Sequence, residues 1–143
     1  MVAWLALTAS ALAQGFQSTP AVVDHIGLHV ADPAKSATFY QRTLGLQPFD
    51  RNPSATMRWV GSASFQIHLI GGRTKPVDKT TETHFAFRVR DLKKELKILD
   101  EERIPWTDSD GAPHKITKRF DGVLQVYFLD PDGYSIEVNQ APE

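Results

Sequence analysis

The 143-residue chain contains no cysteine. Disulfide bonds, thiol nucleophiles and cysteine-ligated metal sites are therefore excluded, and cysteine usage says nothing about the redox compartment. Positive charge is not in excess either, since 16 Lys and Arg stand against 17 Asp and Glu, a formal net charge of −1. Proteins that hold nucleic acid through its phosphates normally carry a basic excess or stripe, so this balance excludes a general polyanion binder.

An uncharged, mostly apolar run at residues 2–13 is shorter than the about 20 residues that cross a bilayer. It ends in Ala11, Leu12 and Ala13 before Gln14, the small-x-small pattern after which a signal peptidase cuts. We interpret residues 1–13 as a signal peptide. The basic residues that normally precede the apolar run are missing, so we expect a truncated or misassigned start. An apolar terminal strand or helix is the alternative. We expect a periplasmic or secreted mature protein without membrane association, or a cytoplasmic one if this segment is not a signal.

Two similar segments lie at an offset of 84 − 25 = 59 residues, HIGLHVAD at 25–32 and HFAFRVRD at 84–91. Both alternate apolar with other residues, as a strand buried on one face does. With 41% hydrophobic and 23% charged residues, the chain has the composition of an ordinary globular protein. We therefore expect one domain, residues 22–140, made of two units, 22–72 and 82–140, each containing a strand, a helix and three further strands.

Helix signals follow both first strands. Asp32 and Asp91 are good N-caps, and Gly45 and Pro105 close the two helical segments. Apolar residues recur between them at helical spacing: Ala37, Tyr40 and Leu44, then Leu92, Leu96 and Leu99. Further extended segments are expected at residues 46–49, 56–60, 64–70, 104–107, part of 108–118, 122–129 and 134–139. The sequence DPDG at 130–133 is a strong turn signal and predicts a hairpin of the last two strands.

Four polar residues occupy matching strand positions in the two units. Because side chains alternate along a strand, His25 and His84 point away from the face that each helix covers. In the fourth strands, His68 and Glu137 likewise oppose the apolar rows. Three imidazoles and a carboxylate converging between two sheets suit a divalent ion such as Ni, Fe, Mn, Co or Zn. The residues alone leave open a polar cavity lined by hydrogen-bonded side chains.

Two other histidines lack this support. His29 has Arg88 as its counterpart in the second unit, and His114 falls in a loop. We interpret both as structural or surface residues.

At this point the chain resembles the vicinal oxygen chelate superfamily, which groups glyoxalase I, fosfomycin-resistance enzymes, extradiol dioxygenases, methylmalonyl-CoA epimerase and bleomycin-binding proteins. The resemblance covers Val22 to Gln140 and rests on six segments: Asp24 to Ile26, Asp32-Pro33, Phe39-Tyr40, Leu44 to Leu46, Thr83 to Phe87, and Asp130 to Glu137. It implies an α+β fold of two βαβββ units forming a cupped, mostly antiparallel sheet. As a set these motifs are specific for the superfamily, but not for one reaction.

By position, His25, His84 and Glu137 match the two histidines and the acid shared by metal-binding members, and His68 falls where bacterial glyoxalase I has a glutamate. The resemblance implies one divalent ion per site, with Glu137 as ligand and catalytic base. It implies a lyase or isomerase similar to lactoylglutathione lyase, acting on a small substrate chelated through adjacent oxygens. A third imidazole would make the centre one charge more positive and a better Lewis acid.

Alternatives within the superfamily are a dioxygenase, a thiol-transferase, or a non-catalytic binder of the bleomycin-resistance type. The binders typically lack the ligand set, so the three matching residues count against that class. A phosphonate site for thiol transfer needs a cationic pocket, and Arg58, Arg88 and Arg119 read more simply as surface charges.

We also expect a homodimer. Short two-unit chains of this superfamily commonly complete the cup with a unit from a partner, which would bring His25 and His68 of one chain to His84 and Glu137 of the other. Aromatic residues in strands are more often core than pocket lining, so Trp59, Trp106 and Phe120 are weaker candidates for contacts with the substrate.

Overall fold

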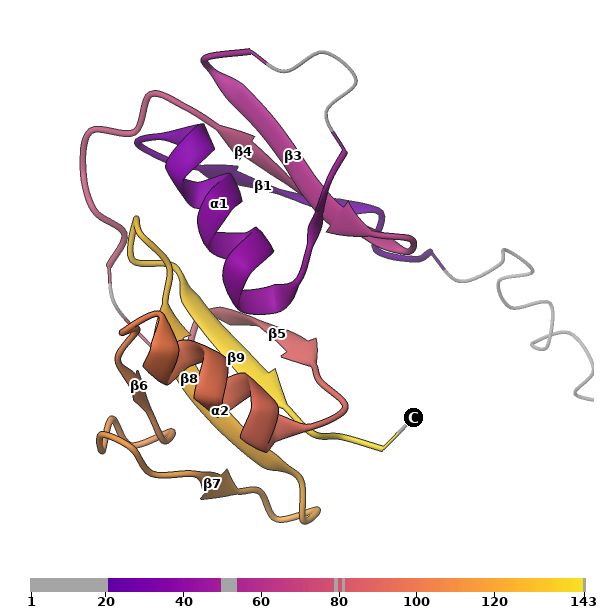
Figure 1. Ribbon diagram of the computed structural model, residues 1–143, viewed down its shortest axis with the longest axis vertical. Helices are drawn as coiled ribbons and strands as arrows, with labels where there is room; N and C mark the ends of the chain where they lie inside the picture. The colour runs from indigo at the N-terminus through magenta and orange to yellow at the C-terminus, as the bar shows by residue number, and fades with distance from the viewer. Residues whose placement is uncertain (1–20, 50–53, 79, 81, 143) are drawn as a thin grey trace, which may run out of the picture.

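The structure, a computed structural model, describes residues 21–49, 54–78, 80 and 82–142. It confirms the predicted fold class, an α+β fold in which each of two units forms a small mixed sheet with one helix (Figure 1). The predicted signal peptide, residues 1–13, lies outside the described residues. No helix in the described ranges is long and apolar enough to span a membrane.

The first unit comprises β1 (His25–His29), α1 (Pro33–Leu44), β2 (Gln47–Pro48), β3 (Met57–Ser62) and β4 (Phe65–Ile70). Its strands lie in the order β1-β4-β3-β2. The β1–β4 pair is parallel and the other pairs are antiparallel.

The second unit comprises β5 (His84–Arg88), α2 (Leu92–Glu101), β6 (Trp106–Thr107), β7 (Thr117–Lys118), β8 (Leu124–Leu129) and β9 (Ser135–Asn139). The order is β5-β9-β8-β6, with β7 also paired to β8. Again the first and last strands are parallel and the rest antiparallel. The two sheets share no strand pairing in the described part of the chain, so one chain does not close a cup.

The helix ends follow the predicted capping. The Asp32 carboxylate accepts hydrogen bonds from the backbone of Ala34 at 2.9 Å and Lys35 at 3.1 Å. Gly45 ends α1 in the left-handed region with φ of 64°, which glycine adopts without a Cβ clash. Asp91 caps α2 through the backbone of Lys94.

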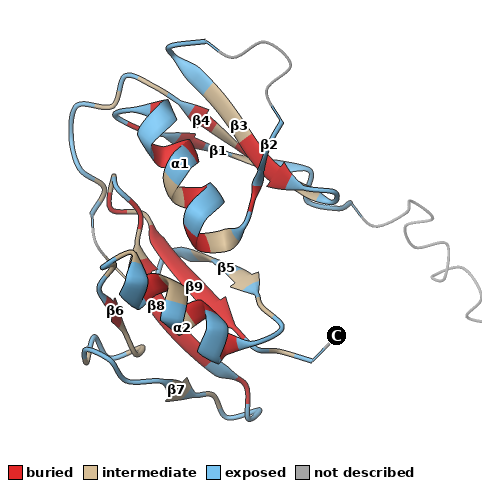
Figure 2. Cartoon of the chain, in the orientation of Figure 1, coloured by how far each residue is buried: buried red, intermediate tan, exposed pale blue. Residues whose placement is uncertain are grey.

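One core serves both units. It lies on the helix side of the sheets, where α1 packs on β3 and β4 and also contacts α2. Fully buried side chains include Val30, Tyr40, Val60, Ile67, Leu69, Leu92, Leu99, Val126, Ile136 and Val138. Figure 2 shows β9 buried along its length, whereas β1 is exposed at alternate positions. The opposite face of each sheet therefore points away from this core, and we call it the outward face.

Hydrogen bonds at the predicted turn fix the two units against each other. The Tyr40 hydroxyl donates to Asp130 Oδ2 at 2.7 Å, and the Ala31 backbone donates to Asp132 Oδ1 at 2.7 Å. Asp130 also accepts from the backbone of Asp132 and Tyr134, which closes the turn between β8 and β9. The predicted hairpin is confirmed.

Candidate metal centre

On the outward face of the first sheet, His25 from β1 and His68 from β4 lie against each other. Their rings stack with centroids 4.0 Å apart and an interplanar angle of 14°. His68 also stacks on Trp59, its neighbour on β3, at 4.2 Å. The strand register thus builds a stack of three rings in the order His25, His68, Trp59.

The surroundings of this pair orient one ring and keep the other uncharged. Asp24 Oδ2 lies 2.7 Å from Nδ1 of His25, so Nδ1 donates to the carboxylate, and this hydrogen bond sets the orientation of the ring. Burial, and then the neighbouring His25, lower the pKa of His68. His68 is therefore uncharged near neutral pH, the form in which an imidazole binds a metal ion.

On the outward face of the second sheet, His84 from β5 lies beside Glu137 from β9. His84 Nε2 is 3.2 Å from Glu137 Oε2. The Glu137 side chain is 6% exposed and that of His84 is 27% exposed. The carboxylate is therefore nearly withdrawn from water and depends on neighbouring side chains for its hydrogen bonds.

Three neighbours hold Glu137 in place. The Tyr127 hydroxyl donates to Oε2 at 2.7 Å, and Asn139 Nδ2 donates to Oε1 at 2.7 Å. Gln125 Nε2 in turn donates to the Tyr127 oxygen at 2.8 Å. Burial and the hydrogen bond to Glu137 raise the pKa of Tyr127 well above its usual range, so the phenol stays protonated. Both carboxylate oxygens are thereby oriented, as in metal sites whose carboxylate ligands are themselves hydrogen-bonded.

Sequence reasoning gave no role to Tyr127, Gln125 or Asn139. A signal was available, because Gln125 and Tyr127 alternate with the buried Val126 and Phe128 along β8. What the sequence does not contain is the register that sets Tyr127 opposite Glu137.

Within one chain, the four predicted ligands form two pairs on separate sheets. Among residues 21–49, 54–78, 80 and 82–142, no three His, Asp or Glu side chains lie close enough together to hold a metal ion. By type the donors suit a divalent ion, since His68 is neutral, His25 keeps one nitrogen free and Glu137 is an oriented carboxylate. Each outward face of a chain contributes half of the set.

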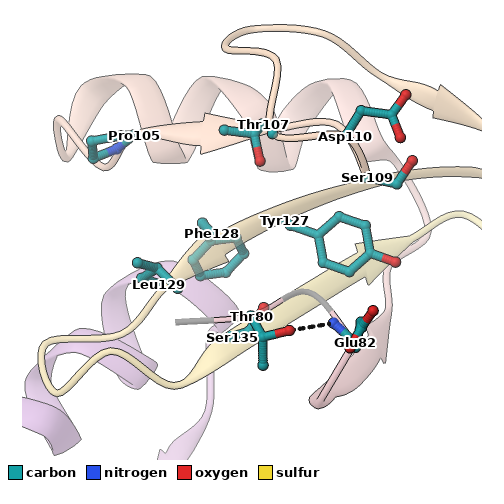
Figure 3. A pocket seen from close by; sticks show the side chains of 11 residues that line it. Thr80, Glu82, Pro105, Thr107, Ser109, Asp110, Tyr127, Phe128, Leu129 and Ser135 are labelled. Carbon is teal, nitrogen blue, oxygen red and sulfur yellow. Dashed lines mark hydrogen bonds between the residues drawn. The ribbon is translucent and has the colours of Figure 1, made fainter. Parts of the chain in front are cut away.

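Beside the second pair lies a hollow of about 610 Å³ (Figure 3). Tyr127 and Ser135 form part of its wall, and Ser135 is the register neighbour of His84. Glu82, Thr107 and Asp110 also line it. The hollow therefore adjoins Glu137 through Tyr127.

The three aromatic candidates for substrate contacts lie in different places. Trp59 belongs to the ring stack, but Trp106 is buried in the core and donates from Nε1 to Asp100 Oδ1 at 2.9 Å. Phe120 is fully exposed. His29 and His114 lie outside both pairs; His114 is exposed and its ring lies 5.0 Å from that of Trp106.

The sequence model of the Glyoxalase/Bleomycin resistance protein/Dioxygenase superfamily matches residues 22–138. The chain belongs to this superfamily. The predicted resemblance is thereby confirmed, and members of the superfamily commonly bind a divalent metal ion. A search among curated proteins found no match.

Solved structures of the superfamily share the fold. Oxidase ChaP-H1 is 28% identical, with a TM-score of 0.70 over 86% of this chain and 98% of that one. Oxidase ChaP-H2 is 22% identical, with a TM-score of 0.72 over 87% and 96%. Lactoylglutathione lyase from Agrobacterium tumefaciens is 18% identical, with a TM-score of 0.66 over 87% and 96%. These names span two kinds of reaction on one scaffold.

Proposed function

We propose that this protein is a metal-dependent enzyme that binds a small substrate through two neighbouring oxygens, at a site completed by two chains of a homodimer. The observation that supports it is the outward orientation of two donor pairs, His25 with His68 and His84 with Glu137. In a twofold dimer the first pair of one chain can face the second pair of the other, and the symmetry then makes two equal sites.

His25, His68, His84 and Glu137 would hold the ion. When bound, a divalent ion supplies Lewis acidity that polarises the two substrate oxygens. The remaining work falls to the chain itself. Asp24 fixes the tautomer of His25, and Tyr127 with Asn139 orients Glu137.

Within this class we favour oxidation, of the oxidase or dioxygenase type. Proton transfer between adjacent carbons is simplest with two acidic residues, and His68 stands where bacterial glyoxalase I has one of them. Glu137 accepts two hydrogen bonds that fix both of its oxygens, as expected of an oriented metal ligand. Imidazoles with one carboxylate are the donor set of non-haem iron oxygenases. The 28% identity with Oxidase ChaP-H1 points in the same direction.

The second candidate is an isomerase of the lactoylglutathione lyase type. It is favoured by the position of Glu137, an ionisable carboxylate beside the hollow that can serve as a single base. A non-catalytic binder is the third class, and it would keep its ligand affinity after chelation.

Metal analysis beside His84→Ala tests the proposal. Purified wild type should hold about one divalent ion per site, and the variant should lose it while keeping its circular dichroism. Equal, sub-stoichiometric metal in both proteins would refute the metal site. Oxygen uptake by iron-loaded protein with 4-methylcatechol then supports oxidation, whereas conversion of the methylglyoxal–glutathione adduct without oxygen uptake supports the isomerase.

We further propose export of the mature protein, on the strength of the run at residues 2–13 and its small-x-small ending. Fractionation of a bacterial host that expresses the full chain should place it outside the cytoplasm, with Gln14 as the first residue by mass spectrometry. An unprocessed chain in the cytoplasm would contradict export.

A further inference from the structure

The wall of the hollow beside Glu137 contains a buried polar atom without a partner. Ser135 is 5% exposed, and its Oγ makes no hydrogen bond. Buried polar groups are normally satisfied, so an unpartnered oxygen in the wall of the hollow indicates that something else supplies a donor there.

The charged residues of the hollow have one sign. Glu82 and Asp110 line it, and none of its described lining residues is Lys, Arg or His. Arg119 is a cation that influences Tyr127, and its guanidinium lies 2.6 Å from Asp121, which offsets its charge. Within this lining an anionic part of a ligand would meet like charges, whereas a cationic part would be attracted.

The loop that carries Asp110 is held in shape. The Asp108 carboxylate accepts from the backbone of Asp110 at 3.0 Å and of Ala112 at 2.8 Å. Ser109 and Thr117 are joined by two hydrogen bonds of 2.8 and 3.0 Å. Figure 3 shows Ser109 and Asp110 on one side of Tyr127, with Glu82 and Ser135 on the other. These hydrogen bonds fix the loop, so Asp110 has a defined position in the wall of the hollow.

We propose that this hollow selects the substrate by charge and hydrogen bonding: it takes neutral or cationic molecules rich in O–H and N–H donors, and rejects carboxylates and phosphonates. The inference rests on the proposed function, in which the metal-bound end of the same substrate lies beside Glu137. Ser135 Oγ, Glu82 and Asp110 then accept hydrogen bonds from the part of the substrate away from the ion.

Three catechols of similar size test this selection, because they share the chelating oxygens and differ in charge. Zinc-loaded protein, which cannot turn them over, is titrated calorimetrically with dopamine, 4-methylcatechol and 3,4-dihydroxybenzoate. Dopamine should bind at least tenfold more tightly than 3,4-dihydroxybenzoate, with 4-methylcatechol between them. Glu82→Gln with Asp110→Asn should bring the three affinities together. Glu101→Gln with Glu102→Gln removes the same charge from the end of α2 and should leave the order unchanged.

Ser135→Ala gives a second readout. Because Oγ makes no hydrogen bond with the described residues, the variant should unfold at the wild-type temperature yet bind dopamine, whose ammonium is the donor away from the ion, about threefold more weakly.

Equal affinity for the three probes, tightest binding of 3,4-dihydroxybenzoate, or an order that survives the double substitution would overturn the selection while leaving the metal site standing. Undiminished affinity for all three probes in zinc-free His84→Ala, with the same order, would support the hollow and refute the metal-dependent function. Binding of none of the three would refute both.

Discussion

The two units place their predicted metal ligands on the same scaffold but in different surroundings, one exposed and one buried. In the first unit, His25 and His68 stand in a ring stack with Trp59 and are supported by Asp24, a carboxylate 86% exposed to solvent. In the second, Glu137 is buried and hydrogen-bonded on both oxygens. The difference follows from burial: an exposed carboxylate is hydrated by water, whereas a buried one needs hydrogen-bond donors from the chain.

The surfaces around the donors differ in the same sense. On the first sheet, Met57 and Ile70 flank the ring stack and are 39% and 42% exposed. On the second sheet, Gln125, Ser135 and Asn139 surround the carboxylate and are each less than 10% exposed. The first outward face thus carries apolar side chains that are partly exposed in a single chain. In the proposed dimer a second copy of the chain would bury them.

The largest effect is expected at the buried carboxylate. Glu137→Gln keeps the shape of the side chain but removes the charge, so bound metal and turnover should fall to background while the fold persists. Metal analysis and circular dichroism measure the two parts. Full metal content in this variant would show that the second unit contributes no charged ligand.

The helix side offers a second contrast, because Glu95 of α2 is the repeat equivalent of Ser36 of α1. Both are buried, but Ser36 hydrogen-bonds Asp132 whereas Glu95 Oε1 has no partner. Burial raises the pKa of Glu95 from 4.5 to about 7. The folded chain therefore binds the proton more tightly than the unfolded chain does, and stability falls as pH rises from about 4.5 to 7.

Glu95→Gln should accordingly raise the free energy of unfolding by about 2 kcal/mol at pH 8, where the wild type carries a buried charge. Near pH 4 the gain should vanish, because the carboxyl is protonated in both states. Urea denaturation at the two pH values measures it, with the exposed Glu101→Gln as control. A gain that is the same at both pH values would contradict this pKa.

Tyr127 and Tyr40 can be compared directly, since each hydroxyl donates to a carboxylate at 2.7 Å. Tyr127 does so beside the candidate centre, and Tyr40 does so in the core. Tyr127→Phe should lower zinc affinity about tenfold, because Glu137 loses its orienting donor. Tyr40→Phe should cost about 1 kcal/mol of stability and leave zinc affinity unchanged. Competition titration with a chelating dye measures the affinity. Equal changes in both variants would mean that the effect is structural.

The smallest effect is expected at Asp24, which orients His25 as Tyr127 orients Glu137, but in water. Exposed pairs contribute little, so Asp24→Asn should weaken zinc binding by about threefold or less. If Asp24→Asn lost more zinc affinity than Tyr127→Phe in the same titration, the first unit would contribute more to ligand orientation than the second, contrary to this account.

Local signals in the sequence predicted most of the fold. Asp32 and Gly45 placed α1, and the turn at 130–133 placed the last hairpin, because caps and turns depend on a few adjacent residues. The strand predicted from residue 122 begins at Leu124, since Gly122 with φ of 86° and the Asp121 side chain extend the turn. Such a tight turn is decided by backbone geometry that alternation does not reveal.

The candidate site was predictable only in part. Strand alternation and the repeat predicted that all four side chains point away from the helices, and the structure pairs His25 with His68 and His84 with Glu137. The role of Tyr127 was not predicted, since it depends on the register between β8 and β9. In the proposed dimer the two pairs meet across two chains, and strand alternation within one chain does not reveal such a contact.

A mixed dimer tests the central proposal most directly. His25→Ala and His84→Ala chains with different tags are co-expressed, and the species carrying both tags is isolated. If the site is shared between chains, one of its two sites keeps all four ligands, and the mixed dimer should hold about half the wild-type metal although neither parent holds any. A mixed dimer without metal, or the failure of the two chains to associate at all, would contradict it.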